Sequence, residues 1–253
     1  MNGSPDFFVG WVAGPPRALR RFRTLVAGGV LAGTVALGIG LGFAADDPAG
    51  AGFSLGASPF PALVLEDWLT ATLTVEPYPV LHLPPVPRLP RGRALLLAGE
   101  GKVGVGDVAA MAGQAIALGG FALRRGDIEM LATGDAPELV GPGAALPVER
   151  LGRWRITGEI CVGKCAGGGM RPGVGIAHRA CATLCLSGDI PAIFVATAPV
   201  AVSPYLLLAD AEGRANLGAF RGLIGQRVRL EVEVLRQGAM LIFLADPVSA
   251  VVP

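Results

Sequence analysis

The longest uninterrupted run of apolar residues lies near the N-terminus, from Thr24 to Ala44. It reads TLVAGGVLAGTVALGIGLGFA and contains no charged residue. A helix needs about 20 apolar residues to cross a bilayer, and this run is longer than the roughly 7–15 residues of a signal-peptide core. We therefore expect residues 24–44 to form a transmembrane helix, although the small residues Ala44 and Ala45 also permit cleavage there.

The charges that flank this run differ in sign on its two sides. Four arginines precede it and two aspartates follow it: Arg17, Arg20, Arg21, Arg23, Asp46 and Asp47. Positively charged flanks stay in the cytoplasm. We therefore expect residues 1–23 to be a cytoplasmic or interfacial segment and the rest of the chain to be periplasmic, in a single-pass protein of a bacterial inner membrane.

The composition supports membrane attachment and gives no sign of nucleic-acid binding. Hydrophobic residues make up 52% of the chain and charged residues only 16%, with a mean hydropathy of +0.56, which is apolar for a soluble protein. The net charge of +1 offers no excess of positive charge to a phosphate backbone. The 38 glycines and 21 prolines are spread along the chain, which favours turn-rich β structure over a helical bundle.

Short apolar strands dominate the segment after the expected linker at 45–62, which is rich in Gly, Ala, Ser and Pro. We expect a first domain over residues 63–148. Its predicted elements are strands at 69–75, 94–98, 115–123 and 128–132, a short helix within 105–111 and a hairpin turn at 124–127. The prolines between residues 77 and 90 predict that this stretch contains no regular element.

The region from 149 to 253 repeats this plan at an offset of 111 or 112 residues. Four pairs of segments match: 94–98 with 205–209, 113–116 with 225–228, 124–126 with 236–238, and 128–132 with 240–244. Self-similarity of this kind indicates two copies of one structural unit, and a helix between the third and fourth strands is typical of the OB barrel. We therefore expect a mainly β chain, with one transmembrane helix followed by two tandem OB-like barrels.

All four cysteines and one of the two histidines lie in one excursion of the second copy: Cys161, Cys165, His178, Cys181 and Cys185. The segment 178–186 lacks Gly and Pro, and it predicts two turns of helix. On that helix His178, Cys181 and Cys185 occupy positions i, i+3 and i+7, which share one face. A loop inserted into a barrel is where proteins usually keep a binding function.

Disulfide formation is one interpretation of this window. Extracytoplasmic domains with four cysteines commonly form two bridges. A bridge from Cys165 to Cys181, or from Cys161 to Cys185, would close a loop of fifteen or more residues. Such a bridge would stabilise the fold by about 3 kcal/mol.

Metal binding is the other interpretation, with Cys161, Cys165, His178, Cys181 and Cys185 as the candidate ligands. Three thiolates with an imidazole, or four thiolates, suit Zn²⁺, Cu(I) or an iron–sulfur cluster. The C-x3-C spacing differs from the usual zinc knuckle, and no C-x-x-C-H haem motif occurs. A thiol–disulfide protein is a third possibility, although the C-x-x-C spacing of thioredoxin-like sites is missing.

Few other residues point to chemistry. No Ser-His-Asp order, phosphate loop or paired-carboxylate pattern occurs, and two histidines are a small inventory for acid–base catalysis. We therefore expect a non-catalytic protein. His82, which lies among prolines, is expected to be structural, and Trp154 and Phe194 are expected to be barrel core.

The run Lys164-Cys165, His178-Arg179-x-Cys181-Ala182-x-x-Cys185-x-Ser187-Gly188-x-Ile190-Pro191 resembles that of a group of uncharacterised bacterial membrane-anchored extracytoplasmic proteins. The resemblance covers roughly residues 150–253 and implies a location and a cysteine/histidine site, but no reaction. The plan of a membrane helix and an extracytoplasmic OB barrel is also similar to that of the haem chaperone of cytochrome c maturation. The histidine-tyrosine haem-attachment motif of that protein is missing from this chain.

These features lead to two expectations for function. The first is an accessory or scaffold subunit of an inner-membrane, electron-transfer complex, which contacts other membrane subunits through residues 24–44 and covers a partner with its weakly charged periplasmic domains. The alternative is an extracytoplasmic protein that binds a metal or a redox cofactor in the window 161–185.

Overall fold

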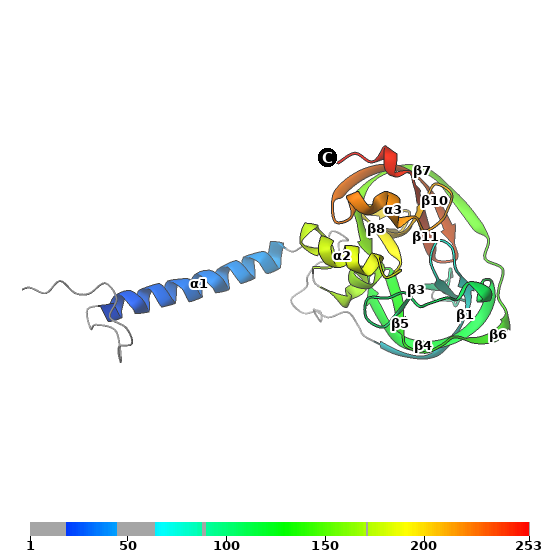
Figure 1. Cartoon of the computed structure of the whole chain (residues 1–253), viewed down its shortest axis with the longest axis horizontal. Coiled ribbons are helices and arrows are strands. Elements are labelled where there is room, and N and C mark those ends of the chain that lie inside the picture. The colour runs from blue at the N-terminus through cyan, green and yellow to red at the C-terminus, as the bar shows by residue number, and fades with distance from the viewer. Residues whose placement is uncertain (1–18, 45–63, 88–89, 171, 253) are drawn as a thin grey trace, which may run out of the picture. The chain divides into compact units, whose positions relative to one another are not determined.

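The computed structural model describes residues 19–44, 64–87, 90–170 and 172–252 (Figure 1). These residues form two units: the first contains the N-terminal helix and the second contains all the strands. The predicted linker at 45–62 and residues 1–18 of the predicted N-terminal segment lie outside the described residues.

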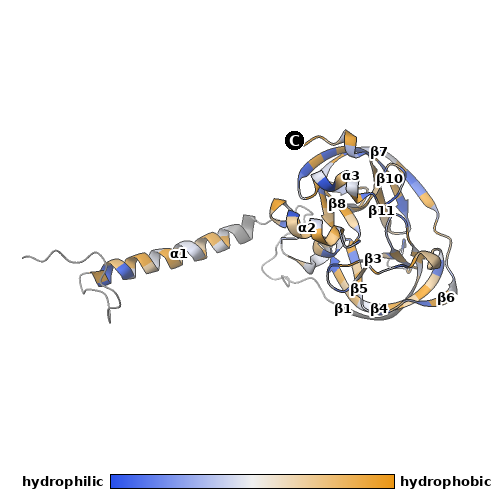
Figure 2. Cartoon of the chain, viewed as in Figure 1, coloured by the Kyte–Doolittle hydropathy of each residue, from blue (hydrophilic) through white to orange (hydrophobic). Residues whose placement is uncertain are grey.

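The first unit is the helix α1 (Arg20–Ala44). Figure 2 shows that apolar residues predominate in the coloured part of α1 and that its charged residues lie at its N-terminal end. Its apolar side chains are exposed; Leu25, for example, is 76% exposed and Leu31 is 68% exposed. The stretch Arg20–Gly40 is long and apolar enough to cross a membrane. The prediction of one long apolar helix near the N-terminus is therefore confirmed.

The first barrel has five strands in the order β1-β2-β3-β5-β4, and it is closed by pairing of β4 with β1. The strands β3 and β5 are parallel and the other neighbours are antiparallel. A short 3-10 helix, η2 (Ala109–Met111), lies between the third and fourth strands, and a sixth strand, β6, pairs with β4. The strands are β1 (Val64–Thr74), β2 (Val80–Leu83), β3 (Arg93–Gly99), β4 (Gln114–Arg125), β5 (Ile128–Thr133) and β6 (Glu138–Pro142).

The second barrel has the same topology, with the order β7-β8-β9-β11-β10 and a parallel pair formed by β9 and β11. The helical turns α3 (Leu217–Phe220) and η5 (Arg221–Leu223) lie between its third and fourth strands. Both barrels therefore follow the OB plan, and the predicted fold class is confirmed. The strands are β7 (Val148–Val162), β8 (Ala192–Val200), β9 (Ser203–Asp210), β10 (Arg227–Gln237) and β11 (Met240–Ala245), followed by the 3-10 turn η6 (Pro247–Ser249).

Equivalent turns explain the repeat in the sequence. Gly113 and Gly225, just before the fourth strand of each barrel, have φ angles of 74° and 68°. Gly126 and Gly238, in the hairpin that follows, have φ angles of 55° and 58°. This left-handed conformation favours glycine because a Cβ atom would be strained there. The glycines repeat in the sequence because both barrels have the same backbone turns at these positions.

Three predictions at the level of single elements need correction. The prolines at 77–90 do not exclude a strand, because β2 occupies the four residues between Pro79 and Pro84 and keeps its N–H groups for pairing with β1 and β3. The second strand of the second barrel, β8, was not predicted at all. Trp154 is not core: it is 38% exposed. Phe194 is core as expected, and it stacks on Phe243 with ring centroids 4.4 Å apart.

The two barrels share an apolar contact, to which the outer face of β3 contributes together with residues of β2, β4 and β5. Leu95 and Leu97 point into the first barrel, whereas Leu96 and Ala98 belong to a cluster that includes the core of the second barrel. Burial on both faces explains why residues 94–98 of this strand are all apolar. Gly163 allows the close approach, since a Cβ atom there would lie 2.7 Å from Leu96 Cδ1.

We expect replacement of Leu96 by alanine to lower the unfolding free energy by about 2–5 kcal/mol, because the side chain is buried between the barrels. Leu139→Ala is the matched control: Leu139 is 64% exposed, and its truncation should change stability by no more than about 0.5 kcal/mol. Denaturant unfolding of the full chain in detergent measures both. Equal stability of the two variants would contradict the shared core.

His82 is a buried structural histidine. It is 5% exposed, and its Nε2 lies 2.9 Å from Thr74 Oγ1. Burial lowers the pKa of His82 from 6.5 to about 4. The folded protein therefore binds this proton less readily than the unfolded chain does.

We expect the contribution of His82 to stability to be complete above pH 6.5 and to be lost as the pH falls from about 6.5 towards 4. The loss should reach up to about 3 kcal/mol. Unfolding free energies measured at pH 7 and pH 4.5 for the wild type and His82→Gln test this. The difference between the two pH values should be smaller in the variant, and an unchanged difference would contradict it.

Candidate metal centre

The cysteine window forms a helical insertion between β7 and β8. It contains a π-type turn, η3 (Cys165–Gly169), a 3-10 turn, η4 (Ile176–His178), and the helix α2 (Arg179–Leu186). The helix lies where the sequence predicted one. Gly168 has a φ angle of 115°, and this glycine conformation ends η3 and lets the chain turn towards α2.

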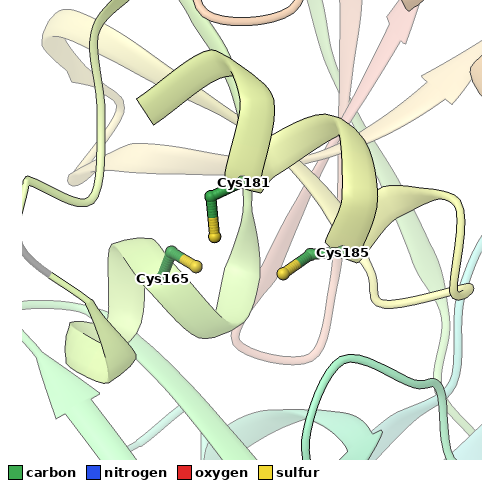
Figure 3. A group of neighbouring side chains, drawn as sticks. All are labelled: Cys165, Cys181 and Cys185. Atoms are coloured by element: carbon green, nitrogen blue, oxygen red, sulfur yellow. The ribbon is translucent and has the colours of Figure 1, made fainter. Parts of the chain in front are cut away.

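Three thiols meet between η3 and α2. The Sγ atoms of Cys165, Cys181 and Cys185 all lie within 4.8 Å of one another. Figure 3 shows the three sulfurs pointing into the same space, Cys165 from η3 and the other two from successive turns of α2. The i,i+4 spacing places Cys181 and Cys185 on one face of the helix. Cys165 and Cys185 are buried and Cys181 is partly exposed, so the group opens to solvent at Cys181.

Cys161 and His178 lie outside this group. Cys161 is fully buried, its Sγ donates a hydrogen bond to the carbonyl oxygen of Gly173 at 2.6 Å, and burial raises its pKa to about 12. His178 is 2% exposed, and neither ring nitrogen has a hydrogen-bond partner among the described residues. The structure thus brings together three of the five predicted ligands.

Two lysines stand beside the thiols. Lys102, in the loop after β3 of the first barrel, donates a hydrogen bond from Nζ to Cys181 Sγ at 3.1 Å. Lys164 donates from Nζ to the carbonyl oxygens of Gly99 and Gly101, at 2.5 and 2.8 Å, and so holds the same loop. Sequence reasoning missed Lys102 because it lies 79 residues from Cys181, in the other barrel.

The loop that carries Lys102 also packs directly on the end of α2. The N–H of Gly104 donates to the carbonyl oxygen of Gly188 at 2.6 Å. A Cβ atom on Gly188 would lie 2.1 Å from the carbonyl oxygen of Lys102, so only glycine fits there. The first barrel therefore forms one wall of the thiol site.

The thiols differ in acidity. Burial raises the pKa of Cys165 and of Cys185, and the charge of neighbouring thiolates raises both further. Partial burial also acts to raise the pKa of Cys181. The hydrogen bond and charge of Lys102, with hydrogen bonds from Cys185 and Cys165, outweigh that effect and lower it overall. Cys181 is therefore the thiol of this group that loses its proton most readily as the pH rises.

All four cysteines are free thiols in this structure. The disulfide pairings considered from the sequence therefore stay predictions. Cys165 lies beside both α2 cysteines, whereas Cys161 is hydrogen-bonded elsewhere. Of the two disulfide pairings named above, Cys165 with Cys181 is the one whose sulfur atoms lie close together in this structure.

Comparisons with models of protein families, with curated proteins and with solved structures found no match to this chain. The assignment of the site therefore depends on its own geometry and chemistry.

The arrangement suits one soft metal ion. Two thiolates bound to one ion with bonds of about 2.3 Å lie about 3.8 Å apart in a tetrahedral site and about 4.0 Å apart in a planar three-coordinate one. The three sulfurs lie within 4.8 Å of one another, so a small movement suffices to bring them to that spacing. Iron–sulfur clusters are held by four cysteine thiolates, whereas three thiols form this group among the described residues.

We expect Cys181 to react with iodoacetamide faster than the other three thiols in reduced, metal-free protein, because it is the most acidic and the most exposed. Lys102→Met should slow this reaction several-fold at pH 7 by raising the pKa of Cys181, and should leave the rate nearly unchanged at pH 10.

Mass spectrometry of labelled peptides measures the order of reaction. Lys102→Arg is the control, since it keeps the positive charge, and the rate at pH 7 should be largely retained. If Cys161 reacted first, or if Lys102→Met had no effect at pH 7, the assigned acidity would be wrong.

Proposed function

We propose that this chain is a membrane-anchored protein that holds one soft metal ion through Cys165, Cys181 and Cys185. The observation that carries the proposal is the approach of three Sγ atoms to within 4.8 Å from two separate helical elements. The thiols belong to a segment that the barrel fold does not require, because the equivalent connection in the first barrel is only Val75 to Pro79.

Cu(I) is the ion that these ligands favour. Thiolates are soft ligands that select Cu(I), Zn²⁺ or iron–sulfur clusters, and structural Zn²⁺ almost always has four ligands. Three thiolates around Cu(I) would carry two negative charges. Lys102 and Lys164 place two ammonium groups beside the thiols, which offsets that charge.

His178 is the residue best placed to act as a fourth ligand if the ion is Zn²⁺. It immediately precedes α2, and both of its ring nitrogens are buried and have no hydrogen-bond partner among the described residues. An unpaired buried imidazole is costly, and burial lowers the pKa of His178, as does the charge of Lys102. The ring is therefore neutral, which is the form that binds a metal.

A periplasmic location of this site is part of the proposal, and the charges that flank α1 support it. The arginines before α1 and the aspartates after it support a cytoplasmic N-terminus and a single span of a bacterial inner membrane. In that compartment free thiols are oxidised to disulfides. A bound metal would keep the three cysteines reduced, and its absence would leave Cys165 able to form a disulfide with Cys181.

The accessory-subunit function is the second candidate, and a feature of α1 favours it. Gly29 and Gly33 have four-residue spacing, and no atom lies within 4 Å of a Cβ atom built on either one. Small residues at this spacing let two membrane helices approach closely. In this role the protein would dock on a larger electron-transfer complex and supply or hold its metal ion without catalysing a reaction.

Metal loading tests the proposal. We expect the full chain, reduced and purified in detergent without chelator, to bind one Cu(I) per chain and to retain it against a weak competitor. Cys165→Ser, Cys181→Ser and Cys185→Ser should each weaken binding by at least tenfold, because each removes one of three ligands. Elemental analysis and competition with a colorimetric Cu(I) chelator give the stoichiometry and the affinity.

Cys161→Ser is the matched control, since its thiol is hydrogen-bonded to Gly173 and lies outside the group. It should retain stoichiometric binding. If the chain binds Zn²⁺ tightly and His178→Ala loses that binding, the site is the four-ligand form, made of the three cysteines and His178. Absence of stoichiometric metal, together with a Cys165–Cys181 disulfide in the native protein, would contradict the proposal and favour the thiol–disulfide alternative.

A further inference from the structure

A second concave site is lined by residues of β1, β2 and β4 of the first barrel and of the connection between the barrels. It shares no residue with the thiol group. This cavity has a volume of about 560 Å³, within the range of pockets that hold small ligands. Its walls are the outer faces of β1 and β2, the connection between β6 and β7, and the turn between β10 and β11. It therefore lies where the second barrel meets the first.

The lining of the cavity is mainly apolar. Small aliphatic and proline side chains come from the first barrel and from the connection between the barrels: Ala71, Leu83, Pro84, Pro85, Ala115, Ala144, Ala145, Leu146, Pro147 and Val148. The connection is held in place by bonds to both sides. The N–H of Ala144 donates to Thr72 Oγ1 at 2.8 Å, and Gln237 Nε2 donates to the carbonyl oxygen of Leu146 at 3.4 Å.

One buried polar atom in this wall has no partner. His82 lines the cavity and is 5% exposed, and its Nδ1 has no hydrogen-bond partner among the described residues. The residue facing Nδ1 is Gly238, where a Cβ atom would lie 2.9 Å from it. The backbone of Gly238 therefore packs against Nδ1 and covers it, so His82 contributes to the wall of the cavity and does not offer this nitrogen to a ligand.

Two arginines line the cavity. Arg236 lines it with a side chain only 12% exposed and pairs with Glu149 at 2.9 Å from Nη1 to Oε2. Arg91 lines it from the exposed rim. Because Glu149 is the one carboxylate in the lining, two guanidinium groups face one negative charge. A guanidinium binds a carboxylate or a phosphate through paired hydrogen bonds.

We infer that this cavity binds a single-chain amphiphile with an anionic head group, either a carboxylate or a phosphate. The aliphatic chain lies on the alanine, leucine and proline lining, and the head group pairs with the guanidinium groups of Arg91 and Arg236. A fatty acid and an alkyl phosphate share this chemistry. The inference does not depend on metal binding, because no thiol lines the cavity.

Photolabelling of the full chain in lipid nanodiscs tests the inference. The probe is a dodecanoic acid that carries a diazirine on its chain, and labelled peptides are located by mass spectrometry. We expect the label in the peptides that contain Leu83 and Leu146. Dodecanoate or dodecyl phosphate should compete at concentrations at least tenfold lower than dodecanol, and the better of the two identifies the head group.

Dodecanol controls for the bilayer, because it enters membranes more readily than the two anions and lacks their charge. If dodecanol competes as well as both anions, the inference is wrong. Arg91→Gln, at an exposed position, should remove most of the advantage of the anions. Arg153→Gln, at an exposed position outside the cavity, should leave it unchanged.

A filled cavity provides a test that does not depend on charge. Ala144→Trp places a large side chain in the lining and should reduce labelling at least fivefold, whereas Ala136→Trp, exposed and outside the lining, should not. Circular dichroism confirms that both variants fold. Undiminished labelling in folded Ala144→Trp would overturn the inference, as would labelling confined to peptides elsewhere in the chain.

Discussion

The contact between the outer face of β3 and the second barrel is the interaction on which the rest of the structure depends. It buries Leu96 and Ala98 against the second barrel and makes β3 apolar on both faces. The loop that follows β3 is then carried across to α2, where Gly104 bonds to Gly188 and Lys102 reaches Cys181. The three cysteines come from the insertion in the second barrel, and the loop after β3 of the first barrel completes the site with Lys102.

This arrangement also determines the electrostatics of the site. Three thiolates in a largely buried position would repel one another strongly, and without a cation the pKa values of Cys165 and Cys185 are raised. Lys102 stabilises the one thiolate that is partly exposed. A bound metal ion would favour the deprotonated form of all three thiols and would offset the repulsion between the sulfurs. The geometry and the charges of the site therefore favour the same occupant.

Much of the fold could be predicted because it depends on local patterns. The apolar run of α1 and the repeated turns at Gly113 and Gly225, or at Gly126 and Gly238, are visible in the sequence. The strand β2 was missed because two prolines flank it directly, and proline disfavours a strand only where its own N–H is needed. Trp154 was misplaced because its position on the outer surface depends on the register of β7 with β10.

The part of the site that depends on local sequence spacing could also be predicted. Helical spacing was enough to place Cys181 and Cys185 on one face of α2. It gave no information on which of Cys161 and Cys165 would face them, since that depends on the turn η3 after β7. Lys102 and the cavity beside His82 arise from contacts between the barrels, and such contacts leave no signal in local sequence.

The central claim is that three thiolates bind one metal ion, and X-ray absorption at the metal edge of the loaded full chain tests it most directly. The account predicts a first shell of three sulfur atoms at about 2.3 Å, with no metal–metal distance. A first shell of nitrogen and oxygen, or a shell with one sulfur or none, would contradict it.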